Sequence, residues 1–159
     1  MGMNVIQAPN KNTIEIAKGV PKVFLAGCAN TDWRKEFVTK FEDKFVVFFD
    51  PKRNDWNLMD ASKTLEQITW EFKHLRDADI IVYHFNAGSV CPITLLEYGF
   101  WGLAYGRPIV VYVSDDYEKR RDIVIQTALA RSDVKIITTE DEFVTKTREV
   151  IEDWTNEQR

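Results

Sequence analysis

Short apolar runs, rich in β-branched and aromatic residues, recur along this chain and alternate with longer segments of helical periodicity. Runs of this length are typical of buried strands rather than of core helices. Because the runs are apolar throughout and a helix separates each pair, they predict a parallel sheet with helices on both faces. The predicted strands are residues 22–28, 45–49, 79–85, 109–113 and 134–137.

The segments between and after these strands are predicted helices, which cover residues 31–41, 60–76, 93–105, 119–130 and 139–154. Asp60 or Ser62 can cap the second helix. The last helix opens with Thr139 and Glu142, which have the spacing of a capping box. The second helix carries an apolar stripe, typical of an amphipathic helix, that consists of Leu65, Ile68, Phe72 and Leu75.

Five strands in this alternation predict an α/β fold with a flavodoxin-like, doubly wound parallel sheet of strand order 2-1-3-4-5. Ligands of such sheets bind at the carboxyl ends of the strands, where the order reverses between the first and third strands. Functional residues should therefore cluster after Cys28, Phe49 and Phe85. The chain has no internal repeat or linker, so we expect a single domain over residues 21–159 after an N-terminal extension over residues 1–20.

Composition argues against several classes of protein. Apolar residues make up 45% of the 159 residues and charged residues 29%, which is typical of a globular protein. The net charge of -4 argues against binding of polymeric nucleic acid, and no apolar run is long enough to span a membrane. The two cysteines, Cys28 and Cys91, are far apart in the sequence, so we expect no disulfide framework and a cytoplasmic location.

Common cofactor and metal motifs are absent from the sequence. It contains no glycine-rich dinucleotide motif, no P-loop, no Gly-x-Ser-x-Gly elbow and no His-Glu-x-x-His pair. The histidines and cysteines lack the spacing of a ligand set. We therefore expect neither a cofactor nor a metal.

Two carboxylates close to apolar residues are the strongest candidates for chemistry. Glu97 lies in an otherwise apolar helix start after the third strand, where burial would be costly unless partners satisfied the charge. It is either a nucleophile or general base at the ligand edge of the sheet, or a residue that points outward or braces a neighbouring helix. Glu71, on the preceding helix, is a second acid or an ordinary solvated residue.

The loop from Asp50 to Trp56 follows the second strand at the same predicted edge. Arg53 is suited to hold a phosphate or carboxylate, and Trp56 is suited to stack on a base. An ordinary charged turn is the alternative interpretation of this loop.

Together these segments resemble the nucleoside 2-deoxyribosyltransferase superfamily, and in particular its bacterial and phage deoxyribosyltransferase-like branch. The resemblance covers about residues 23–113. The motifs that carry it are Phe24-Leu25-Ala26-Gly27, Asp50-Pro51-Lys52-Arg53-Asn54-Asp55-Trp56, Gln67-x-x-Trp70-Glu71, Leu75, Ala78-Asp79 and Pro92-Ile93-Thr94-Leu95-Leu96-Glu97-Tyr98-Gly99.

The resemblance implies a role for each motif. Glu97 takes the place of the nucleophile that attacks C1′ of the deoxyribose, and Glu71 that of an acid that handles the proton of the departing base. Cys91 stands six residues before the nucleophile, where relatives have Asp or Ser, and this departure bears on substrate choice. The expected substrate-binding residues are Ala26, Gly27, Cys28, Arg53, Asp55, Trp56, Asn86, Ser89 and Cys91.

The implied reaction cleaves the N-glycosidic bond of a 2′-deoxynucleoside and transfers the sugar to another free base through a covalent intermediate on Glu97. One alternative is a hydrolase of deoxynucleoside 5′-monophosphates, which Ser89, Cys91 and Arg53 favour mildly. Another alternative is a non-catalytic nucleotide sensor. The expected partners are a deoxynucleoside or deoxynucleotide and a free nucleobase, and the resemblance also implies a homo-oligomer.

Overall fold

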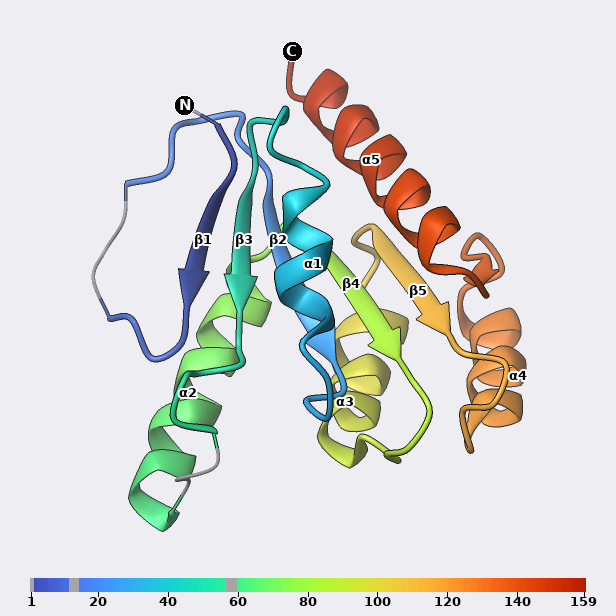
Figure 1. The fold of residues 1–159 in the computed structure, drawn as a ribbon. Helices are drawn as coiled ribbons and strands as arrows, with labels where there is room; N and C mark the ends of the chain where they lie inside the picture. The colour runs from blue at the N-terminus through green and yellow to red at the C-terminus, as the bar shows by residue number, and fades with distance from the viewer. Residues whose placement is uncertain (1, 12–14, 57–59) are drawn as a thin grey trace.

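One parallel sheet of six strands, ordered β1-β3-β2-β4-β5-β6, organises the chain. Figure 1 shows β1 to β5 side by side in this order. The computed structural model describes residues 2–11, 15–56 and 60–159. The strands are β1 (Asn4–Gln7), β2 (Lys22–Gly27), β3 (Val47–Asp50), β4 (Ile80–Phe85), β5 (Ile109–Val113) and β6 (Ile136–Ile137). The five predicted strands correspond to β2 to β6, and their predicted order is confirmed.

The sixth strand, β1, corrects the expected strand count. It lies in the segment assigned to an N-terminal extension, of which residues 1 and 12–14 are outside the described residues. β1 pairs in parallel with β3, Asn4 opposite Val47 and Gln7 opposite Asp50. Its sequence, Asn-Val-Ile-Gln, contains only two apolar residues, of which Ile6 is buried and Val5 is exposed. Such a short edge strand has little of the pattern that identified the others.

Helices cover both faces of the sheet, as predicted (Figure 1). One face is covered by α1 (Trp33–Thr39) and α5 (Glu140–Glu157). The other is covered by α2 (Ala61–Asp77), by α3 (Pro92–Glu97) with the π-helical segment η2 (Tyr98–Leu103), and by α4 (Arg120–Ala130). Side chains of each strand alternate between the two layers, so that Phe24 and Ala26 pack with one and Val23 and Leu25 with the other.

The helix caps are partly as the sequence predicts. Asp60 caps α2 by accepting a hydrogen bond from the backbone N–H of Lys63 at 3.0 Å. At the start of α5, the hydroxyl of Thr139 accepts from the backbone N–H of Glu142 at 3.2 Å. Ser62 instead donates its hydroxyl to the carboxylate of Asp60.

The apolar stripe of α2 faces away from the core, contrary to what an amphipathic pattern normally means. Leu65, Ile68 and Phe72 are 70%, 56% and 52% exposed, and only Leu75 of that stripe is buried. The inward face carries Gln67 and Trp70, which are both buried. Polar groups therefore point inward on this helix, and they do so at the carboxyl ends of the strands.

Candidate active site

A cavity of about 330 Å³ opens at the carboxyl ends of β2 and β4, where the strand order reverses. It gathers residues from the end of β2, from the loop after β3, from α2 and from the start of α3. Eight of the predicted site residues line it, namely Ala26, Gly27, Cys28, Trp56, Glu71, Ser89, Cys91 and Glu97.

Glu97 and Glu71 meet in this cavity from different helices. Their carboxyl groups hydrogen-bond to each other, so one of the two must carry a proton. Glu97 ends α3 where the winding widens into η2, a kind of junction that often occurs at functional sites. The helix is held there by Tyr98, whose hydroxyl lies 2.5 Å from the hydroxyl of Thr127 in α4.

The proton of this pair belongs to Glu97. Burial, followed by the negative charge of Glu71, raises the pKa of Glu97 well above its ordinary value. Burial also raises the pKa of Glu71, but hydrogen bonds to its carboxylate and a nearby arginine oppose that rise. Of the two carboxyl groups, Glu97 is therefore the one that holds a proton more readily.

Gln67 orients the carboxylate of Glu71. Its side-chain N–H group donates to Glu71 Oε1 at 2.8 Å and to the carbonyl of Pro51 at 2.6 Å. Gln67 also lines the cavity, and its Oε1 is a buried oxygen without a hydrogen-bond partner among the described residues. From the sequence, Gln67 was recognised only as part of a motif. Its spacing of four from Glu71 on one helix is the signal that would have identified the contact.

Arg34 is the second residue that sequence reasoning missed. It is 3% exposed in the first turn of α1 and lines the cavity. The signal that could have identified Arg34 is its position three residues before the buried Phe37, which places both side chains on the face of α1 that packs against the sheet.

Gly27 is required by the backbone of the neighbouring strand. Its φ is +154°, and a Cβ at this position would lie 2.6 Å from the carbonyl oxygen of His84 in β4. A glycine also lets a ligand approach the backbone closely, which fits the expectation that Gly27 binds substrate. The steric reason does not depend on any ligand.

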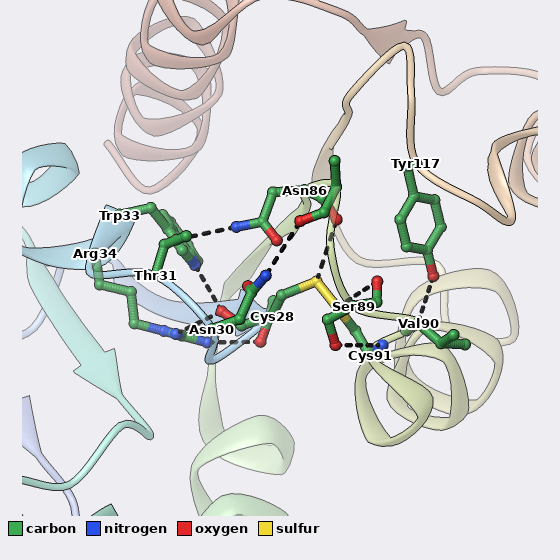
Figure 2. The surroundings of a disulfide bond; sticks show 12 residues. Cys28, Asn30, Thr31, Trp33, Arg34, Asn86, Ser89, Val90, Cys91 and Tyr117 are labelled. Carbon is green, nitrogen blue, oxygen red and sulfur yellow. Dashed lines mark hydrogen bonds between the residues drawn. A yellow bond between two sulfur atoms is a disulfide. The ribbon is translucent and has the colours of Figure 1, made fainter.

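Cys28 and Cys91 form a disulfide bond, with their Cα atoms 5.1 Å apart (Figure 2). The expectation that the two cysteines would stay unpaired was wrong, because the fold brings together two loops that are 63 residues apart in sequence. The cytoplasmic location was inferred partly from unpaired cysteines and loses that support. The bond ties the end of β2 to the residue that precedes α3.

Cys91 is further constrained by its backbone. It has the left-handed φ of +52° and is followed by Pro92, the first residue of α3. Its N–H donates to the hydroxyl of Ser89 at 3.2 Å. The segment that carries Glu97 is therefore fixed at its start by a covalent bond and a local turn.

Three predicted residues lie outside this cavity. Arg53 and Asp55 form an ion pair 2.5 Å apart, and Arg53 also pairs with Glu66 at 3.0 Å. These contacts tie the loop after β3 to α2, next to Trp56. Asn86 donates its side-chain N–H to the hydroxyl of Thr31 at 3.0 Å and lies beside the disulfide (Figure 2).

Neither metal ligands nor a membrane helix stand out in the described ranges 2–11, 15–56 and 60–159. Their His, Cys, Asp and Glu side chains form no group of three or more that could hold a metal ion. No helix within these ranges is both long enough and apolar enough to cross a bilayer.

Comparison with known proteins identifies one family. No curated protein matches the chain. A family model described as nucleoside 2-deoxyribosyltransferase like matches residues 20–117, a stretch that contains β2 to β5 and every residue that lines the cavity. The chain therefore belongs to the nucleoside 2-deoxyribosyltransferase-like family.

Proposed function

We propose that the protein is a nucleoside 2-deoxyribosyltransferase in which Glu97 is the nucleophile and Glu71 handles the proton. The observation that carries this proposal is the hydrogen-bonded pair of carboxyl groups in a cavity that is otherwise lined largely by apolar side chains. Double-displacement cleavage of a glycosidic bond uses a carboxylate nucleophile and a second carboxyl group that handles the proton, and the cavity holds such a pair.

In the first half of the reaction, the sugar lies with C1′ next to Glu97. As Glu97 passes its proton to Glu71, its carboxylate becomes free to attack C1′. The bond between C1′ and the base nitrogen breaks, its electron pair stays on the nitrogen, and Glu71 delivers the proton to the base. The enzyme then carries an ester between Glu97 and the deoxyribose.

In the second half, another base enters and loses a proton to Glu71. Its nitrogen attacks C1′, the ester breaks, and Glu97 is released as a carboxylate. The proton is again shared by the pair, so atoms and charge balance over the cycle. If water replaces the second base, the same steps amount to hydrolysis.

A phosphate-bearing substrate is the second candidate, and a neighbouring cavity favours it. This cavity, of about 280 Å³, shares Ala29, Arg34, Lys52 and Trp56 with the first. Its lining contains four cationic side chains, Arg34, Lys35, Lys52 and Arg53, against the two acids Asp32 and Asp50. That charge balance suits an anionic group and supports the alternative of a deoxynucleoside 5′-monophosphate hydrolase.

A homo-oligomer is part of this proposal. Several apolar side chains on α2, α3 and η2 are exposed, and these are Leu65, Ile68, Phe72, Ile93, Leu96 and Phe100. Ile68 and Ile93 also line the cavity, so a second copy of the chain seated on this face would shield the site from water. Sedimentation at working concentration tests this, and a monomer would contradict it.

The first experiment is chromatography of the protein incubated with each 2′-deoxynucleoside and each 5′-monophosphate, with and without a second free base. A new deoxynucleoside that forms only with the second base supports transfer. Free base without exchange indicates a hydrolase, and turnover of monophosphates alone indicates the second candidate. Unchanged substrates would favour a nucleotide sensor and contradict the proposal.

Glu97→Gln tests the nucleophile. The amide keeps the size and hydrogen-bonding capacity of the carboxyl group but cannot form the ester, so turnover should be lost while circular dichroism stays unchanged. Substantial activity of this variant would exclude Glu97 as the nucleophile. Glu157→Gln, on the exposed end of α5, is the matched control.

A further inference from the structure

Arg34 is a buried cation at the junction of two strand ends. Its guanidinium donates hydrogen bonds to the carbonyls of Leu25 at 3.0 Å and Gly27 at 2.9 Å. It also donates to the carbonyl of Cys28 at 3.2 Å (Figure 2). These three carbonyls belong to the end of β2 and the turn after it. The arginine therefore fixes the backbone that forms one wall of the cavity.

Arg34 forms an ion pair with a carboxylate of the neighbouring strand β3. Asp50, at the end of β3, is 3.7 Å from Arg34 Nε and is itself largely buried. Asp50 also accepts a hydrogen bond from the backbone N–H of Lys52 at 2.9 Å. Burial lowers the pKa of Arg34 to about 10, so the guanidinium stays charged at neutral pH.

The positive charge of Arg34 acts on the acid pair from a third element, α1. It lowers the pKa of both Glu71 and Glu97, against the burial that raises them. The other groups that face the pair are Gln67, which donates to Glu71, and Tyr83 of β4, whose own pKa is raised chiefly by burial. Of Arg34, Gln67 and Tyr83, Arg34 is the group that carries a positive charge.

We propose that Arg34 is a positioning residue for the Glu71–Glu97 pair: it holds the turn after β2 in place and supplies, from α1, a buried positive charge that favours the ionised form of the pair. The catalytic part of this inference rests on the proposed function. The electrostatic part concerns the ligand-free protein and can be tested without turnover.

The test measures the titration of the pair by carbon-13 NMR of the glutamate side-chain carboxyl carbons, with Glu97→Gln and Glu71→Gln for assignment. Arg34→Met should raise the titration midpoints of the pair by about 1–3 pH units, the size of effect expected of a nearby opposite charge. Arg34→Lys, which keeps the charge, should shift them less. Unchanged midpoints in Arg34→Met would overturn the proposal.

Asp50→Asn keeps the proposal falsifiable if Arg34→Met does not fold. This variant removes the negative charge that offsets Arg34, so the midpoints of the pair should move down; an upward shift would contradict the proposal. Arg148→Met is the matched control, because Arg148 of α5 pairs with Asp43 on the surface at 2.6 Å. Its titration should match that of the unmodified protein.

Kinetics separate this proposal from the proposed function. If the enzyme turns over, the acidic limb of kcat/KM in Arg34→Met should move to higher pH by the same interval, with about a tenfold loss per unit below the new midpoint. A purely structural role would lower activity equally at every pH. If no substrate is turned over, the proposed function fails, while the NMR titration still decides the role of Arg34.

Discussion

Reduction of the Cys28–Cys91 disulfide should destabilise the protein by an amount that follows from its position. The bond closes a loop with a sequence separation of 63. In the chain-entropy model a loop of this length stabilises the folded state by about 4 kcal/mol at 25 °C, because it restricts the unfolded chain. For a protein of this size each kcal/mol moves Tm by about 2–4 °C, so reduction should lower Tm by roughly 10 °C.

The assay is thermal unfolding followed by circular dichroism, with and without a phosphine reductant, after thiol titration has counted the free thiols in each sample. The double variant Cys28→Ala/Cys91→Ala is the control. Its Tm should lie near that of the reduced protein and should not respond to the reductant.

Two results would refute the reasoning. One is an unchanged Tm of the native protein when thiol titration shows that both cysteines are free. The other is an equal response of the double variant to the reductant, which would place the effect elsewhere in the chain.

Three further perturbations have defined outcomes. Gly27→Ala should cost about 1–3 kcal/mol in urea unfolding, because its Cβ would lie 2.6 Å from the His84 carbonyl, whereas Gly106→Ala has open space and should be near neutral; equal effects would contradict the steric reason. Glu97→Gln should be more stable than the native protein at neutral pH. Because the pKa of Glu97 is raised in the folded state, its contribution to stability is fully present below the unfolded pKa of about 4.3. That contribution is lost as the pH rises through the folded pKa. The Tm difference between the two proteins should therefore grow with pH and vanish near pH 4, and a constant difference would contradict it. Trp56→Ala should raise KM by the equivalent of about 1–3 kcal/mol if the indole stacks on the base, with Trp56→Phe closer to the native value; an unchanged KM in Trp56→Ala would exclude stacking.

The strands that pack on both faces could be predicted from the sequence, and so could their order. Runs such as Ile-Ile-Val-Tyr-His-Phe in β4 are buried at every position and have no other stable environment in a chain of this size. β1 was missed because an edge strand buries little and needs little apolar pattern. Hydrophobic pattern therefore identified every strand from the centre of the sheet to its β6 edge but not the strand at its β1 edge.

The site was predicted only in part, for a physical reason that α2 makes plain. Rules of amphipathicity assume that polar residues face water, yet the inner face of α2 carries Gln67 beside Glu71, and the apolar stripe is exposed. Arg34 was overlooked on the same assumption. The disulfide could not be predicted either, because only the fold brings Cys28 and Cys91 together.

β1 shields the outer edge of β3, whose four residues are all buried. During synthesis Asn4 leaves the ribosome about 40 residues before its partner Val47, a delay of roughly 2–8 s at about 5–20 residues per second. β1 has therefore already been synthesised when β3 emerges, so the backbone N–H and C=O groups along the outer edge of β3 have a partner at once. An unpaired strand edge is a template for pairing with other chains. A chain that lacks β1 would therefore expose the edge of β3 and be prone to aggregate.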